Sequence, residues 1–262
     1  MNISTLFSLE GRIALVTGGS RNLGKTIAKA YIAQGATVYI NSRKATDCDA
    51  TAEELGPKCH SLPQDISSVE GARALAEALA EKEQKLDILV NNAGAAWGAS
   101  FEDFPEAGWD KVMDLNLKSP FFLTQALYPL LKAGGKNGVL AKVINITSID
   151  GQRLNPWETY SYHASKSGLI YLTKRLAARL VRDNIVVTSI APGAFASDMN
   201  TQARDNSASV GKHIPLGRIG TEEDLAGTAI YLASRAGDYV VGDTITLDGG
   251  IVHASLGQIT DD

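Results

Sequence analysis

The chain has 262 residues, of which 44% are hydrophobic and 21% charged. This composition is typical of globular proteins, and the length suffices to bury a core without disulfide bonds. The formal net charge is -4, and Lys and Arg are scattered among acidic residues, which excludes the basic face of a nucleic-acid-binding protein.

The cysteines and the apolar segments limit the protein class further. Cys48 and Cys59 lack CxxC spacing and a nearby histidine cluster, so we expect two free thiols and no metal site. The first residues, MNISTLFSLEGR, have no basic stretch followed by an apolar one, as a secretory signal would. No apolar run approaches the roughly 18 residues that cross a bilayer. We therefore expect a cytoplasmic protein that binds no membrane.

Short apolar, β-branched runs recur along the chain and predict strands. They occupy residues 13–17, 37–40, 86–92, 142–148, 185–191 and 244–248, with a weaker candidate near residues 60–62. Between them lie segments with helical spacing. Ile27 and Tyr31 share a helix face that ends before Gly35, a predicted C-terminal cap. A leucine stripe runs along residues 169–180.

The alternation of strands and helices predicts an α/β fold. Apolar strands indicate a parallel sheet that is covered on both faces. We expect a single Rossmann-type, doubly wound domain over residues 1–262, with about seven parallel strands and six helices. Residues 194–213 are polar and rich in Ala and Ser, and we expect this segment to be mobile.

A glycine-rich turn, TGGSRNLG at residues 17–24, follows the first strand. In doubly wound sheets this turn receives a pyrophosphate, because the unpaired N–H groups and dipole of the new helix attract anions. Gly18 and Gly19 favour a tight turn, and Gly24 lets the helix approach the strand. Asn22 stands where such turns usually carry glycine, although asparagine tolerates the left-handed region better than most residues. A purely structural turn is the alternative.

Further motifs follow the glycine-rich turn in order. They are NNAG at residues 91–94, Asn116 within LNLKS, Ser148 after the fifth strand, Tyr162 and Lys166 in YxxxK, Pro192-Gly193, and Asp248-Gly249-Gly250. Together they cover essentially the whole chain, which resembles the short-chain dehydrogenase/reductase family. The segments SLEGRIALVTGGSR, LDILVNNAG and WGAS are most similar to the NADPH-dependent β-ketoacyl reductases of that family. The resemblance implies an oxidoreductase that transfers hydride to or from a small carbonyl or alcohol compound.

The spacing of Tyr162 and Lys166 suits carbonyl reduction, in which the oxygen must receive a proton as hydride reaches the carbon. Free tyrosine has a pKa of about 10, which a nearby ammonium lowers. Residues four apart share a helix face, so Lys166 lies within reach of Tyr162. Tyr160 has Ala164 at that distance, so we do not assign it. Ser148 would hydrogen-bond the developing oxyanion.

The resemblance completes the catalytic set. It implies that Lys166 also binds the nicotinamide ribose. It further implies that Asn116 holds a water in a proton relay to Lys166. Taken singly, each of these residues could equally serve packing or a turn, and only their joint presence favours the catalytic interpretation.

The end of the second strand indicates NADP(H) rather than NAD. An acid there would bind the ribose 2′-hydroxyl of NAD, whereas arginine accommodates the 2′-phosphate of NADP. Here Ser42 and Arg43 follow the strand, and Arg21 lies in the glycine-rich turn. Two arginines converging on one phosphate form a good anion site. Both could instead be solvated surface charges.

The resemblance assigns the remaining cofactor contacts. It places adenine near Asp65 and Ile66, the adenosine ribose near residues 92–94, and the carboxamide near residues 192–197. The full expected set is Gly18, Ser20, Arg21, Asn22, Leu23, Ser42, Arg43, Asp65, Ile66, Asn92, Ala93, Gly94, Tyr162, Lys166, Pro192, Gly193, Phe195 and Ser197.

The substrate and the assembly state are less constrained by the residues. Trp97 and Trp157 would border a pocket for an apolar ketone or a 3-oxoacyl chain, although simple packing explains either tryptophan equally well. The alternatives are a polyol or sugar dehydrogenase working in the oxidative direction and a catalytically silent NADP-binding sensor. The resemblance implies a homotetramer formed through the long helices. The leucine stripe fits such an interface, but it could equally face the sheet.

Overall fold

The strands form one parallel sheet in the order β3-β2-β1-β4-β5-β6-β7 in this computed structural model, which describes residues 3–136 and 138–255. Residues 1–2, 137 and 256–262 of the predicted domain lie outside the described residues. The bounds of the strands are β1 (Ile13–Thr17), β2 (Thr37–Asn41), β3 (Cys59–Ser61), β4 (Ile88–Asn91), β5 (Ala141–Ile146), β6 (Ile185–Pro192) and β7 (Thr244–Leu247).

The predicted strands are confirmed, including the weak third one. Strands β4, β5 and β6 are buried along their whole length, as expected for a sheet covered on both faces. The strand order reverses between β1 and β4, which pair directly. In such sheets the crevice at this reversal, outside the carboxyl ends of the strands, is where ligands bind.

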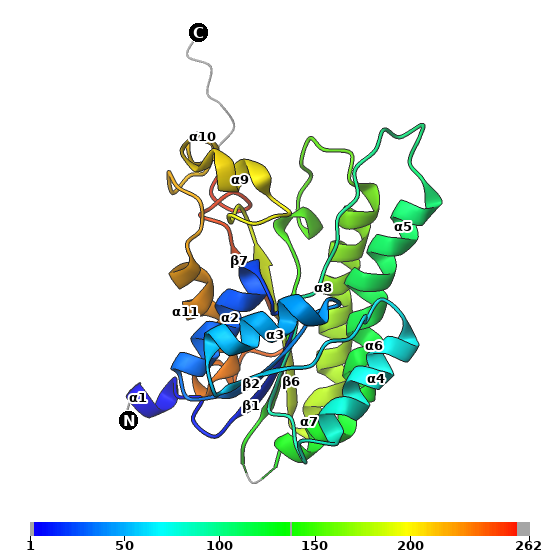
Figure 1. Ribbon diagram of the computed structural model, residues 1–262. Coiled ribbons are helices and arrows are strands. Elements are labelled where there is room, and N and C mark those ends of the chain that lie inside the picture. The colour runs from blue at the N-terminus through cyan, green and yellow to red at the C-terminus, as the bar shows by residue number, and fades with distance from the viewer. Residues whose placement is uncertain (1–2, 137, 256–262) are drawn as a thin grey trace.

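Helices cover both faces of the sheet, as predicted (Figure 1). One layer contains α2 (Asn22–Ala33), α3 (Ala45–Leu55) and α11 (Glu222–Ala233). The other contains α4 (Val69–Ala80), α6 (Ser119–Ala126) and α8 (Tyr160–Leu180), with α5 (Glu106–Met113) packed on α8. Gly35 follows α2 with a φ of +100°, the cap conformation predicted for it.

Alternate residues of each strand enter two separate apolar cores. In β1, Val16 packs beneath α2 and α11, whereas Leu15 packs beneath α4 and α6. The same alternation places Ile144 of β5 in the first core and Val143 in the second. Because successive side chains of a strand point to opposite faces, both cores are built from the same strands.

The leucine stripe of α8 faces the sheet only in part. Leu169 and Leu180 are buried together with Thr173 and Ala177, and α8 packs against β6. Leu172 and Leu176 lie at the margin of this face and are half-buried.

Short helices complete the chain. They are α1 (Ile3–Leu6), α7 (Tyr128–Gly134), α9 (Thr201–Asp205) and α10 (Ser207–Gly211), with single turns η2 (Ile149–Gly151), η3 (Val181–Asp183) and η4 (Arg235–Gly237). The polar segment 194–213, which we expected to be mobile, folds into α9 and α10 at the carboxyl edge of the sheet (Figure 1). The local cap of α9 supports this structure, since the Asn200 side chain accepts from Ala203 N at 3.1 Å.

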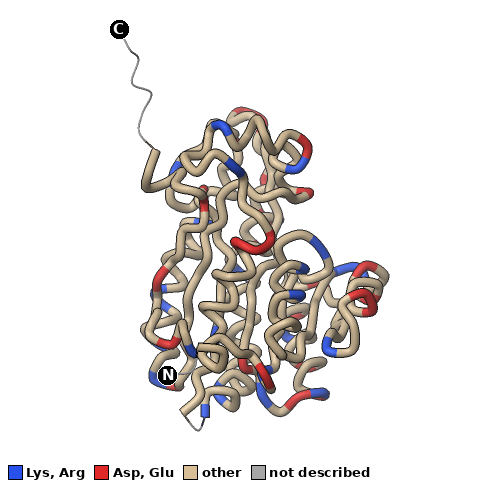
Figure 2. The backbone as a smooth tube through the Cα atoms, turned by 90° about the vertical axis from the view of Figure 1, so that its left-hand side faces the viewer, with Lys and Arg blue, Asp and Glu red and all other residues tan. Residues whose placement is uncertain are grey.

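Basic and acidic residues are interspersed along the molecule (Figure 2). Within residues 3–136 and 138–255, no helix is both long enough and apolar enough to cross a membrane.

Candidate active site

A cleft of about 1440 Å³ opens at the carboxyl ends of the strands, where the strand order reverses. It brings together residues from the glycine-rich turn, the ends of β2, β4, β5 and β6, and the start of α8. Of the predicted catalytic and cofactor residues, the cleft is lined by Gly18, Ser20, Arg21, Asn22, Leu23, Ser42, Arg43, Asp65, Ile66, Asn92, Ala93, Gly94, Ser148, Tyr162, Lys166, Pro192, Gly193, Phe195 and Ser197.

The glycine-rich turn is held close to the loop after β4. Gly18 has a φ of +62°, and a Cβ placed there would lie 3.0 Å from the Cα of Ala93. The Asn92 side chain donates to the backbone oxygen of Thr17 at 2.8 Å and to that of Gly18 at 3.2 Å. The Asn92 amide therefore braces the turn, while its predicted role was a contact with the adenosine ribose.

Asn22 has a φ of +47°, so the residue that replaces the usual glycine adopts the left-handed conformation. Arg21, the N-cap of α2, is extended and makes no side-chain cap hydrogen bond. The first N–H groups of α2 consequently have no side-chain cap, and the residues around them line the cleft. This arrangement fits a phosphate group.

Ser148, Tyr162 and Lys166 come together where β5 ends and α8 begins. Ser148 and Tyr162 both line the cleft, and the Ser148 side chain is close enough to affect the pKa of Tyr162. Lys166 Nζ donates to the Ile146 carbonyl at 2.8 Å and lies 5.6 Å from the centroid of the Tyr162 ring. Tyr160 lies elsewhere: its hydroxyl donates to Glu158 at 2.7 Å, which supports the choice of Tyr162.

Burial shifts the pKa values of both Tyr162 and Lys166 from their usual ranges. Burial raises the pKa of Tyr162 to about 12, although the neighbouring Ser148 side chain acts to lower that pKa. Burial also lowers the pKa of Lys166 to about 8. The Lys166 ammonium, which we expected to lower the tyrosine pKa, donates to the Ile146 carbonyl. Tyr162 is therefore a neutral phenol near pH 7 and has a proton to donate.

Asn116 lies behind the cleft in η1 (Asp114–Lys118), a π-helical turn between α5 and α6. Single π-helical turns of this kind frequently occur at functional sites. The buried side chain donates to Ala95 O at 2.9 Å and accepts from Ala95 N at 2.8 Å. Asn116 Oδ1 and Lys166 Nζ both approach Gly94, where a Cβ would lie 3.3 and 3.7 Å from them. The absence of a side chain at Gly94 therefore leaves room for both the Asn116 and the Lys166 side chains.

The end of the cleft beside β2 is lined by positively charged side chains. Arg43 is exposed and lines the cleft with Lys44, which sequence reasoning missed although it directly follows Arg43. The Ser67 N–H, 3.0 Å from Asp65, is the main group that lowers the Asp65 pKa, and Arg43 lowers it further. Arg21 does not turn toward Arg43: its Nη1 lies 3.3 Å from Asp198 Oδ2.

The two tryptophans are placed differently. Trp157 is 58% exposed and lines the cleft. Trp97 is not among the described residues that line it. Its indole packs on Gly108 of α5, where a Cβ would lie 2.7 Å from the ring, and Lys111 Nζ lies 5.1 Å from the ring centroid. Packing, the alternative for each tryptophan, therefore accounts for Trp97.

Comparisons with known proteins agree with this arrangement. The family described as enoyl-(acyl carrier protein) reductase matches residues 18–252. A rhamnolipids biosynthesis 3-oxoacyl-[acyl-carrier-protein] reductase from Pseudomonas aeruginosa is 45% identical over 249 residues, covering 93% of this chain and 97% of that protein.

Two solved structures are similar over nearly the whole chain. The Pseudomonas aeruginosa RhlG/NADP active-site complex has a TM-score of 0.91 and 44% identity, covering 96% of this chain and all of that one. A gluconate 5-dehydrogenase from Burkholderia cenocepacia in complex with NADP and tartrate has a TM-score of 0.89 and 32% identity, covering 97% of this chain and 100% of that one.

The backbone conformation of Asn22 predicts which substitutions the turn tolerates. We expect Asn22→Gly to keep the free energy of unfolding near that of the wild type, because glycine adopts positive φ freely. Asn22→Val should lower it by about 1–3 kcal/mol, because a β-branched residue is strained there. Both variants lose the amide, so their difference in urea unfolding isolates the backbone effect. Equal stability of the two variants would contradict the assignment.

The burial of Lys166 predicts a pH-dependent stability. Between pH 8 and 10.5 the unfolded chain still binds a proton at Lys166 that the folded chain has released, so the cost of burying the ammonium falls as the pH rises. The free energy of unfolding of the wild type, measured relative to Lys166→Met, should therefore increase by about 3 kcal/mol across this range. Lys174→Met, at an exposed position of α8, should show no such trend. A flat difference for Lys166→Met would show that the lysine is not desolvated.

Proposed function

The chain belongs to the short-chain dehydrogenase/reductase family, and from this premise we propose that it reduces a ketone to a secondary alcohol with NADPH. The enzyme is an NADP(H)-dependent oxidoreductase, as its family and its NADP-bound structural relatives support. The observation that carries the proposal is the meeting of Ser148, Tyr162 and Lys166 in one cleft, with Lys166 Nζ 5.6 Å from the centroid of the Tyr162 ring.

The proposed reaction assigns a task to each catalytic side chain. NADPH supplies the hydride when bound. Tyr162 donates its proton to the carbonyl oxygen, and Ser148 hydrogen-bonds the same oxygen and orients it. Lys166 favours the resulting tyrosinate by its positive charge, which desolvation makes more effective. Asn116 holds the Ala95 backbone next to Lys166, where the family's proton relay would pass.

The start of α2 and two arginines provide the proposed contacts to the phosphate groups of the cofactor. The uncapped start of α2 would receive the pyrophosphate, and Arg43 with Arg21 would bind the 2′-phosphate of NADPH. No carboxylate stands at Ser42 to favour NAD instead. Residues that line the cleft would therefore bind both the pyrophosphate and the 2′-phosphate of the cofactor.

A 3-oxoacyl compound is the proposed substrate class, since the rhamnolipid-pathway relative is a 3-oxoacyl reductase by name. A sugar or polyol dehydrogenase is the second candidate. It is favoured by the gluconate 5-dehydrogenase relative and by the cationic cleft residues Lys111 and Arg153. A silent sensor is less well supported, because the Ser148–Tyr162 pair and Lys166 are intact.

The assembly is proposed to be a homo-oligomer, and a tetramer by family resemblance. Large apolar side chains are exposed on the outer side of α5 and α8, including Trp109 at 41% and Tyr171 at 74%. An interface through these helices would cover them.

Substrate screening tests the proposed function. We expect NADPH oxidation with 3-oxoacyl thioesters or other ketones, and a loss of roughly 10²- to 10⁴-fold in kcat for Tyr162→Phe because the proton donor is removed. Tyr160→Phe is the matched control and should retain activity. Turnover only of polyols or sugar acids with NADP⁺ would favour the second candidate. NADPH binding with no turnover of any carbonyl or alcohol would favour the sensor.

Cofactor choice is tested at Arg43. Replacing it by Asp removes a charge-assisted phosphate contact and adds a like charge, so NADPH should bind about 10- to 100-fold more weakly. NADH, which lacks the 2′-phosphate, should be affected far less. Arg182→Asp, at an exposed position in η3 that does not line the cleft, controls for the change in net charge and should leave both affinities unchanged. An unaltered NADPH preference in Arg43→Asp would refute the assignment.

A further inference from the structure

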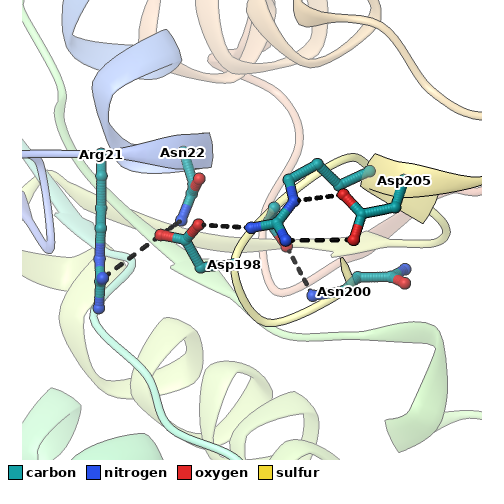
Figure 3. Close-up of polar contacts among 7 residues, drawn as sticks. Arg21, Asn22, Asp198, Asn200 and Asp205 are labelled. Carbon is teal, nitrogen blue, oxygen red and sulfur yellow. Dashed lines mark hydrogen bonds and ion pairs between the residues drawn. The ribbon is translucent and has the colours of Figure 1, made fainter. Parts of the chain in front are cut away.

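Asp198 joins the two walls of the cofactor cleft (Figure 3). Its Oδ2 accepts from Arg21 Nη1 at 3.3 Å and from Asn22 Nδ2 at 3.2 Å, both in the glycine-rich turn. Its Oδ1 accepts from Arg204 Nη1 of α9 at 3.1 Å. One carboxylate therefore connects the β1–α2 turn to the segment that follows β6, about 175 residues away in the chain.

These contacts are weak enough to exchange. Charge-assisted hydrogen bonds are typically 2.7–2.9 Å long, and those from Arg21 and Asn22 are longer. The side chain of Arg21 is 72% exposed and that of Asp198 is 50% exposed, so water screens the pair. Stabilisation of the fold is therefore not the main consequence of this arrangement.

The segment that carries Asp198 keeps its structure without the turn. Asn200 N donates to Ser197 Oγ at 3.0 Å, and the Asn200 side chain caps α9. Arg204 remains paired with Asp205 through two contacts of 2.8 and 3.2 Å. Release of Arg21 and Asn22 would thus leave Asp198 beside a cation and the segment folded.

The donors that Asp198 engages are those that a phosphate would use. Arg21 and Asn22 stand at the start of α2, where the helix attracts anions. In this arrangement a carboxylate of the chain itself takes their hydrogen bonds. Asp198 lines the cleft, so a bound dinucleotide would bring its negatively charged phosphates near the Asp198 carboxylate, and these like charges would repel.

We propose that Asp198 is a specificity-determining residue that competes with the phosphates of NADP(H) for Arg21 and Asn22. This inference rests on the proposed NADP(H) function. Cofactor binding transfers the two donors from Asp198 to phosphate, so that Asp198 lowers the affinity for the dinucleotide. Because Arg21 serves the 2′-phosphate, the effect is larger for NADPH than for NADH. The same transfer frees the turn from its link to α9, whose residues Thr201 and Gln202 also line the cleft.

Binding titrations with Asp198→Asn test the proposal. Asparagine keeps the size of the side chain and removes the charge. We expect NADPH to bind three- to tenfold more tightly than to the wild type, measured by the change in its fluorescence, and NADH to gain less than twofold. Asp205→Asn is the matched control. It removes one carboxylate charge from the neighbouring helix α9 but does not contact the turn, and both affinities should stay within twofold.

A double-mutant cycle tests whether Asp198 acts through Arg21. In an Arg21→Ala background, Asp198→Asn should no longer favour NADPH over NADH. Weaker NADPH binding by Asp198→Asn, equal effects of Asp198→Asn and Asp205→Asn, or an unchanged effect in the Arg21→Ala background would each overturn the proposal. Thermal unfolding of every variant confirms that the binding data come from folded protein.

The outcome for the wild type separates this inference from the proposed function. A wild type that binds neither NADPH nor NADP⁺ would overturn both. A wild type that binds NADPH, with an Asp198→Asn variant that binds it equally well, would overturn only the role of Asp198.

Discussion

The hydrogen bonds between Thr17 and the loop after β4 are the contacts on which the cleft depends. Thr17 Oγ1 accepts from the N–H groups of Asn92 and Ala93, each at 3.0 Å, and Asn92 returns a bond to Thr17 O. They lie where the strand order reverses, so β1 and β4 are neighbours but their connections leave in opposite directions. A crevice must open there, and these bonds set its width.

The same edge of the sheet also positions the side chains that we propose as catalytic. Gly94 follows Asn92 and Ala93 in this loop, and because it has no side chain, Asn116 and Lys166 can approach its backbone closely. Lys166 in turn donates to the last residue of β5, Ile146. A continuous set of contacts therefore runs from β1 through β4 to β5, and it holds both the glycine-rich turn and the proposed acid–base groups at one edge of the sheet.

Two features of the site are unfavourable for the stability of the fold. Lys166 of α8 is only 4% exposed, and Asn22 adopts positive φ in the glycine-rich turn although it is not glycine. Such departures are expected at functional sites, where local preference conflicts with chemistry. The two apolar cores on either side of the sheet offset their cost, since between them they bury the central strands β4, β5 and β6 along their whole length.

The sequence by itself determined the strands, the parallel sheet and the candidate residues, because these follow from spacing along the chain. Apolar runs buried on both faces identify strands, and the four-residue step identifies the Tyr162–Lys166 pair. The tertiary structure alone decided where side chains point and how well they are solvated. It turned Arg21 to Asp198, packed Trp97 on Gly108, directed Asn92 to the turn, and raised the pKa of Tyr162 to about 12. Each of these outcomes depends on neighbours supplied by distant segments, which no local pattern records.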